Sequence, residues 1–102
     1  MCEIFARQDP GRYQPVTRRI RLNGQSTSVR LEAVFWEIID DIAREQGEST
    51  GSFLSTLHRE VLEYYGEPLN FASLLRCSCL ARLEARQSSP AQGAGPALRR
   101  IA

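Results

Sequence analysis

The sequence predicts a mainly α-helical domain with a short N-terminal β-hairpin. Two runs, TRRIRL and QSTSVRL, alternate polar and apolar residues on either side of Asn23-Gly24, the pair that most strongly favours a two-residue hairpin turn. From Phe35 onward, apolar residues instead recur every three or four positions, which is the period of an α-helix. Gly47 and the segment Gly66-Glu67-Pro68 divide this helical part into three.

The chain of 102 residues has room for one domain, which the pattern divides into three parts. Residues 1–16 contain Asp9-Pro10-Gly11 and Pro15, which interrupt regular structure, so we expect an irregular arm. Residues 17–85 hold the hairpin and the helices. Residues 86–102 are rich in Ser, Pro, Gly, Ala and Gln without any period, and the sequence predicts a disordered tail there.

The two-residue turn fixes the register of the hairpin, so that Arg21 faces Ser26 and Arg19 faces Ser28. Because side chains alternate along a strand, the polar and apolar residues separate onto two faces. The polar face holds Arg19, Arg21, Ser26, Ser28 and Arg30. The apolar face holds Ile20, Leu22, Val29 and Leu31.

Three helices are expected, over residues 33–46, 50–65 and 71–85. The stripe of the first helix is Phe35, Ile38, Ile39 and Ile42, and that of the second is Phe53, Leu54, Leu57, Val61 and either Tyr64 or Tyr65. One broad side of the third helix holds Phe71, Leu74, Leu75, Ser78 and Leu83. Ser49 or Thr50 can cap the second helix and Asn70 the third. The adjacent Tyr64 and Tyr65 cannot share one helical face, so one ring is expected in solvent or against a partner.

Charge is arranged in blocks along the chain. Residues 1–31 carry a net charge of +4, residues 32–68 carry −7 and residues 69–102 carry +4. All thirteen basic residues are arginine, whose forked guanidinium suits phosphate groups and guanine edges. A general bias of composition toward arginine would give the same count.

A strand followed by two helices has an open strand edge and a small core. Both defects disappear if two chains pair their strands antiparallel around a twofold axis, which gives an intertwined homodimer with a shared antiparallel sheet. The outer face of a β-ribbon can enter a major groove of DNA. Ser26, Ser28 and Arg30 then reach base edges, and backbone N–H groups near Ser49 and Thr50 can hold a phosphate.

The stretch TSVRLEAVFWEIIDDIAREQGESTGSFLSTL, followed by NFASLLRCSCL, resembles the bacterial ribbon-helix-helix domains of the Arc/MetJ-like superfamily. It is most similar to a subfamily with Ser-x-Arg-Leu-Glu, Phe-Trp, a Gly-x-Ser turn and Asn-Phe-Ala-Ser-x-Leu-Arg. The resemblance covers about residues 17–83. It implies a homodimeric DNA-binding protein, usually a transcriptional regulator, that reads bases from Ser26, Ser28 and Arg30. It also implies a phosphate-binding turn at Gly47, Ser49 and Thr50.

One departure from the simplest members concerns the width of the sheet. The hairpin gives two strands per chain and four in the dimer, and four strands about 4.8 Å apart are wider than a major groove of about 12 Å. Either the outer strands bend away and place Arg19 and Arg21 on phosphates, or the sheet binds something else. A twofold protein that reads DNA predicts a pseudo-palindromic operator.

Two other classes of protein remain open. One is a protein–protein interaction module, antitoxin-like or adaptor-like, that holds a protein partner through the sheet, the third helix or the tail. The other is a structural dimer in which Arg19, Arg21 and Arg30 pair with acids of the neighbouring chain.

Enzymatic and metal-binding functions are not expected. The chain has one histidine, His58, and its acids show no spacing that catalysis requires. Cys77 and Cys79 point about 200° apart on a helix, which suits small buried side chains better than joint metal ligation. We expect no cofactor, reduced thiols and no membrane partner, because no apolar run approaches the roughly 20 residues of a membrane span. A soluble cytoplasmic protein is predicted.

Overall fold

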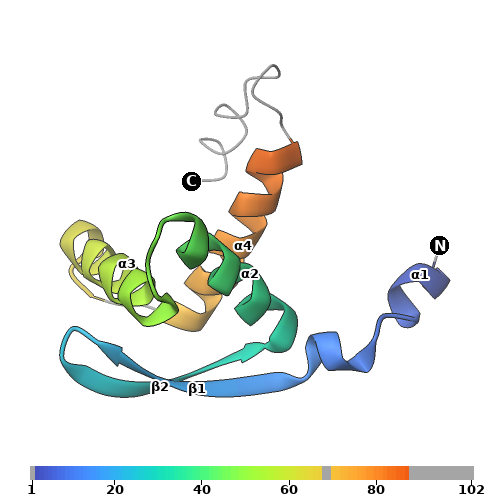
Figure 1. Ribbon diagram of the computed structural model, residues 1–102, viewed down its shortest axis with the longest axis horizontal. Coiled ribbons are helices and arrows are strands. Elements are labelled where there is room, and N and C mark those ends of the chain that lie inside the picture. The colour runs from blue at the N-terminus through green and yellow to red at the C-terminus, as the bar shows by residue number, and fades with distance from the viewer. Residues whose placement is uncertain (1, 68–69, 88–102) are drawn as a thin grey trace.

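A curved two-stranded hairpin carries the three longer helices on one of its faces, as the computed structural model shows (Figure 1). The structure describes residues 2–67 and 70–87. The chain runs through α1 (Cys2–Ala6), the 3-10 helix η1 (Pro10–Tyr13), β1 (Pro15–Leu22), β2 (Gln25–Glu32), α2 (Ala33–Glu45), α3 (Thr50–Tyr65) and α4 (Phe71–Gln87). The predicted class, a mainly α-helical chain with an N-terminal hairpin, is confirmed, while the homodimer stays a prediction.

The hairpin turns at Asn23 and Gly24, which have φ angles of 51° and 92°. Glycine adopts this left-handed backbone freely, and asparagine tolerates it. The register agrees with the prediction, with Arg21 opposite Ser26 and Arg19 opposite Ser28. Pairing continues as far as Pro15 and Glu32, so β1 begins two residues earlier than expected.

The helices begin and end within two residues of the predicted positions because their capping residues act as expected. The hydroxyl of Ser49 accepts a hydrogen bond from the amide of Ser52 at 3.1 Å and starts α3. The side-chain oxygen of Asn70 accepts from the amide of Ser73 at 3.1 Å at the start of α4. Gly66, in the left-handed conformation, ends α3.

The core lies between the apolar face of the hairpin and the three helices. Its buried side chains are Ile20, Leu22, Val29, Leu31, Trp36, Ile39, Leu54, Leu75 and Cys79. In α2 the buried residues are Trp36, Ile39 and Ala43, whereas the predicted stripe members Phe35 and Ile38 pack at the margin and are only partly buried. The stripe is therefore rotated toward Trp36, whose indole N–H donates to the carbonyl of Val16 at 2.9 Å.

The N-terminal arm is more regular than predicted. It contains α1, stabilised by a backbone hydrogen bond from Arg7 to Glu3 at 2.9 Å, and η1, where the carboxylate of Asp9 accepts from the amide of Gly11 at 3.1 Å. Asp9-Pro10-Gly11 therefore starts a short helix instead of leaving the segment irregular. At the other end, α4 extends to Gln87, and the rest of the predicted tail, 88–102, lies outside the described residues.

Candidate nucleic-acid interface

The outer face of the hairpin brings together the predicted base-reading and phosphate-binding residues of the strands. Alternation along β1 and β2 places Arg19, Arg21, Ser26, Ser28 and Arg30 on this face, and all five are exposed. Their strand neighbours Ile20, Leu22, Val29 and Leu31 are buried. The face therefore presents three guanidinium groups and two hydroxyls on a backbone that the core holds in place from behind.

The three arginines on this face form no ion pair among residues 2–67 and 70–87. Arg19 makes only a long contact of 3.5 Å to the hydroxyl of Ser28, and Arg21 donates to the carbonyl of Gly24 at 3.4 Å. By contrast, Arg7, Arg18, Arg44, Arg76, Arg82 and Arg86 each pair with a carboxylate. Of the five arginines without an ion pair in the described part of the chain, three therefore lie on the outer face, and the other two are Arg12 and Arg59.

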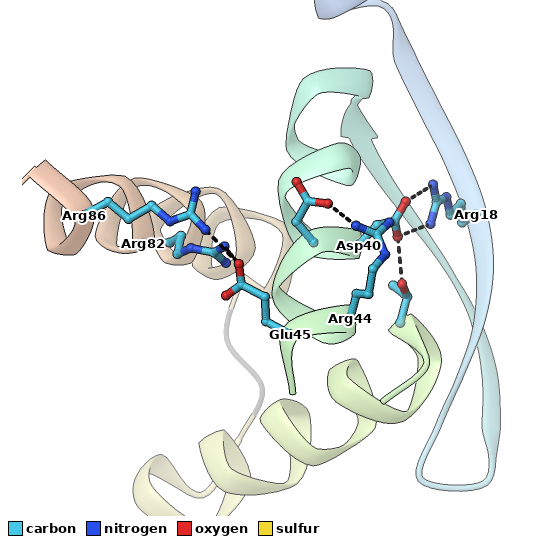
Figure 2. Close-up of polar contacts among 8 residues, drawn as sticks. Arg18, Asp40, Arg44, Glu45, Arg82 and Arg86 are labelled. Atoms are coloured by element: carbon cyan, nitrogen blue, oxygen red, sulfur yellow. Dashed lines mark hydrogen bonds and ion pairs between the residues drawn. The ribbon is translucent and has the colours of Figure 1, made fainter. Parts of the chain in front are cut away.

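Arg18 lies on the opposite face of the hairpin and connects β1 to α2. Its guanidinium donates two hydrogen bonds to the carboxylate of Asp40, at 2.9 and 3.0 Å, and Thr50 donates a third to the same carboxylate at 2.7 Å (Figure 2). The guanidinium also lies over the ring of Trp36, 4.4 Å from its centre. The hydrogen bonds from Arg18 lower the pKa of Asp40, and the carboxylate of Asp40 raises the pKa of Arg18.

Two further ion-pair groups attach α4 to the rest of the chain. Arg76 donates to the carboxylate of Glu32, at the junction of β2 and α2, at 2.9 Å and lowers the pKa of Glu32. Arg82 and Arg86 both donate to the carboxylate of Glu45 at the end of α2 (Figure 2). The arginines of α4 are therefore used within the fold.

The turn before α3 was predicted to hold a phosphate through backbone N–H groups near Ser49 and Thr50. Ser49 is the cap of α3, but the hydroxyl of Thr50 points to Asp40. The carboxylate of Glu48 accepts a hydrogen bond from the hydroxyl of Ser52 at 2.9 Å. Two carboxylates therefore lie near the positive end of this helix, and they oppose the approach of a phosphate. Phosphate binding by the backbone N–H groups of this turn stays a prediction.

The outer edge of β2 is open. A pair that flanks a two-residue turn exchanges both backbone hydrogen bonds, so Thr27 and Val29 direct their backbone groups to β1. The intervening residues Ser26, Ser28 and Arg30 direct theirs away from β1, where no strand of the described chain pairs with them. An open groove of about 360 Å³ lies along β2, lined by Leu22, Gln25, Thr27, Ser28, Val29, Arg30, His58, Phe71 and Ala72.

The cysteines of α4 lie on different sides of the helix, as its period predicts, but the expectation that both are small buried side chains is wrong for Cys77. Cys79 is fully buried, and Cys77 is exposed. Burial raises the pKa of the Cys79 thiol to about 11, so this thiol stays protonated at neutral pH. Within the described residues no group of three or more His, Cys, Asp or Glu side chains could hold a metal ion. No helix in the same part of the chain is long and apolar enough to cross a bilayer.

A strand with an open edge that leads into two helices, here β2 followed by α2 and α3, is the architecture of a ribbon-helix-helix protein, to which this chain adds β1 and α4. The family model described as ribbon-helix-helix domain matches residues 15–83, and the chain belongs to this family. The family predicted from the sequence is thereby confirmed. Its members are commonly DNA-binding regulators or antitoxins.

A solved structure shares the fold of this chain. The chain is similar to an uncharacterized protein from Bordetella pertussis Tohama I, with 40% sequence identity and a TM-score of 0.81. The similarity covers 93% of this chain and 77% of that protein. No curated protein matches the chain.

Proposed function

We propose that the chain forms a homodimer that binds double-stranded DNA through the outer face of its hairpin and regulates transcription. The observation that carries this proposal is the contrast between the arginines of the two faces. Arg18 on the inner face is paired with Asp40, whereas Arg19, Arg21 and Arg30 have no carboxylate partner among the described residues. Exposed, uncompensated arginines on a rigid face are suited to a polyanion.

The homodimer is supported by the open edge of β2 and by the margin of the core. Backbone groups of Ser26, Ser28 and Arg30 can pair with the same residues of a second chain running antiparallel, which gives the strand order β1-β2-β2-β1. Phe35 and Phe71 lie at the margin of the core and are only partly covered by their own chain. A second chain beside β2 would cover the groove there and complete this core.

The arrangement of the four strands suggests how the face meets the duplex. The two central strands would be the copies of β2, which carry Ser26, Ser28 and Arg30. At about 4.8 Å per strand, this central pair fits a major groove of about 12 Å, whereas all four strands do not. Arg19 and Arg21 on the outer strands would then lie at the groove edges, where the phosphates are. This arrangement assigns base contacts to β2 and phosphate contacts to β1.

The proposal favours duplex DNA over single-stranded nucleic acid because the outward positions of the hairpin hold no aromatic side chain. Sheets that bind single strands stack bases on aromatic side chains. The outward positions of the hairpin are Thr17, Arg19, Arg21, Ser26, Ser28 and Arg30, between Pro15 and Glu32 at its open end, and none of them is aromatic. Hydrogen-bond donors without a stacking surface suit base edges and phosphates of a duplex.

The test is a fluorescence-anisotropy titration of the protein against genomic DNA fragments, with Arg30→Ala and Arg59→Ala as the variant and its control. Arg59 is also exposed and unpaired within the described residues, but it lies on α3. If Arg30 reads a guanine, Arg30→Ala weakens binding to selected fragments by about 1–3 kcal/mol and Arg59→Ala does not. Equal effects of the two variants would contradict base reading by Arg30.

A protein–protein interaction module is the second candidate, because α4 has an exposed apolar surface. Leu80 is 54% exposed and lies off the side of α4 that buries Leu75 and Cys79, whereas Leu83 is 43% exposed and lies on that same side, one turn beyond Cys79. An antitoxin-like or adaptor-like protein would use this surface for a protein partner. Stoichiometric co-purification of one protein, lost in Leu80→Ser together with Leu83→Ser, would favour this function over DNA reading.

A further inference from the structure

The short helix α1 carries apolar side chains that its own chain leaves uncovered. Ile4 is 72% exposed and Phe5 is 63% exposed, and α1 buries no residue. Figure 1 shows α1 at the end of the arm, clear of α2, α3 and α4. A five-residue helix is too short to be stable alone in water, so its apolar side chains need a surface to pack against.

We propose that α1 packs on the second copy of this chain, against the last turn of the partner's α3. This inference rests on the proposed pairing of the two β2 strands, and it adds a second contact between the chains. The arm would extend from one chain to the other, so that α1 of each chain covers the exposed end of α3 of its partner.

The register places the arm of one chain and the turn of the other at the same end of the shared sheet. β1 begins directly after the arm, and its first residue, Pro15, pairs with Glu32 at the end of β2. In an antiparallel pair, the end of one β2 lies beside the beginning of the other. The beginning of β2, Gln25, directly follows the hairpin turn. Each arm therefore leaves the sheet beside the partner's turn.

The end of α3 lies close to the hairpin turn. The hydroxyl of Ser55 donates to the carbonyl of Arg21 at 2.8 Å and accepts from the amide of Asn23 at 3.3 Å. The side-chain nitrogen of Asn23 lies 3.0 Å from Nδ1 of His58. These contacts fix the middle of α3 beside the turn, so its last turn lies at the same end of the molecule as the hairpin turn (Figure 1).

That last turn exposes two aromatic rings with no cover from the described chain. Tyr64 is 83% exposed and Tyr65 is 73% exposed. Because α3 packs over β1, the relevant offset in the four-stranded sheet is that between the two copies of β1, which lie three strand spacings, about 14 Å, apart. Packed helices have axes about 8–10 Å apart, so α1 reaches the partner's α3 if it lies about one strand spacing inward of its own β1. Ile4 and Phe5 would then meet the aromatic pair of the partner subunit.

The direction of the arm supports this placement. The amide of Ala33 donates to the carbonyl of Gln14 at 2.9 Å, which continues the hairpin ladder past Pro15. The 3-10 helix η1 packs beside the start of α2. The arm therefore leaves the sheet in a fixed direction, and α1 is held beyond the sheet instead of folding back onto its own helices.

Disulfide cross-linking between two differently substituted chains tests the contact, because Cys2 of α1 is an exposed natural thiol. One chain carries Cys77→Ser and keeps Cys2. The other carries Cys2→Ser, Cys77→Ser and Tyr65→Cys, or, as the control, Leu80→Cys in place of Tyr65→Cys. Mild oxidation of the mixed dimers is expected to give a cross-linked heterodimer several-fold faster with Tyr65→Cys. Equal rates with the two acceptors would overturn the proposal.

A second measurement keeps the two proposals apart. Analytical ultracentrifugation gives the dimer dissociation constant of the unsubstituted chain and of Ile4→Ser with Phe5→Ser, with Leu80→Ser as the exposed apolar control. Loss of two apolar contacts is expected to raise the constant roughly tenfold or more. A monomeric unsubstituted chain would contradict both the ribbon dimer and this inference. A dimer unaffected by the α1 substitutions would contradict this inference alone.

Discussion

The guanidinium of Arg18 and the carboxylate of Asp40 form two parallel hydrogen bonds, at 2.9 and 3.0 Å, between the inner face of β1 and the middle of α2. Trp36 lies one turn before Asp40 on the same side of α2 and supports the guanidinium from its ring face. Thr50 brings the first residue of α3 to the same carboxylate. A single pair thereby fixes the positions of the hairpin and two helices relative to one another.

Arg18→Ala is expected to destabilise the chain by about 1–2 kcal/mol. The variant loses a bidentate pair and a cation–π contact and leaves Asp40 half-buried with Thr50 as its remaining donor. The estimate allows for solvent screening, since about a third of each side chain is exposed. Urea unfolding measures the difference in the free energy of unfolding.

Arg44→Ala is the matched control, because the Arg44–Asp41 pair is mostly exposed. Equal losses in the two variants would show that the inner-face pair has no special role.

Stability is also expected to fall in acid. The pKa values of Asp40 and Glu32 are lowered by the arginines beside them. A carboxyl group with a lowered folded pKa stabilises the fold above its unfolded pKa, about 3.9 for Asp and 4.3 for Glu, and this contribution is lost as pH falls through the folded value. Urea midpoints measured from pH 6 down to pH 3 should therefore decrease. Asp40→Asn should flatten this dependence, and an unchanged slope in the variant would contradict the assignment.

The sequence predicted the hairpin in detail because Asn23-Gly24 permits one turn and one register, and the register decides which face every strand residue takes. The helices followed from their caps. The ion pair between Arg18 and Asp40 was not predicted, although the sequence contains two indications of it. Arg18 is two residues before Ile20 and so lies on the same face of β1, and Asp40 lies four residues after Trp36 and so lies on the same side of α2. The apolar period alone could not show that two charged side chains would meet across 22 positions of the chain.

The cap of α3 shows a second limit of the sequence pattern. Either Ser49 or Thr50 was expected to cap this helix, because both residue types are good N-caps. In the structure Ser49 caps α3, while Thr50 turns to Asp40. That choice depends on where α2 lies against the turn, which no local motif contains.

The three cysteines are expected to react with a thiol reagent in two classes. Cys2 and Cys77 are exposed, whereas Cys79 is buried, and burial raises the pKa of its thiol to about 11. Labelling with a disulfide reagent at pH 8 should therefore modify two thiols rapidly in the folded chain and the third only after unfolding in urea. Cys79→Ala should remove the slow class and leave the fast class unchanged. Rapid reaction of all three thiols would mean that α4 separates readily from the core.

Two glycine substitutions should distinguish the effect of a strained backbone conformation from the effect of steric crowding by an added Cβ. An added Cβ meets nothing within 4 Å at either Gly24 or Gly51, but Gly24 has a φ of 92° and Gly51 has ordinary helical backbone in α3. Gly24→Ala is expected to cost about 1 kcal/mol or more, since alanine is strained in the left-handed region. Gly51→Ala should be neutral or stabilising by up to about 1 kcal/mol, because it is a better helix former. Thermal unfolding compares the two, and a stabilising Gly24→Ala would contradict the turn geometry.

Arg19 and Arg21 are expected to act on DNA affinity without changing which sequence is preferred. Both are exposed on the outer strand of the proposed dimer, where they would meet phosphates instead of bases. Each dimer carries two copies of each, so replacing both by alanine removes up to about four phosphate contacts. Affinity depends on salt with a logarithmic slope of about −0.9 for each contact, and the slope should become less steep by about 3–4. Anisotropy titrations at several salt concentrations measure this change, with Arg59→Ala on α3 as the control. If the double variant keeps the steep slope, the phosphate contacts lie elsewhere on the molecule. If its sequence preference changes, these arginines contact bases.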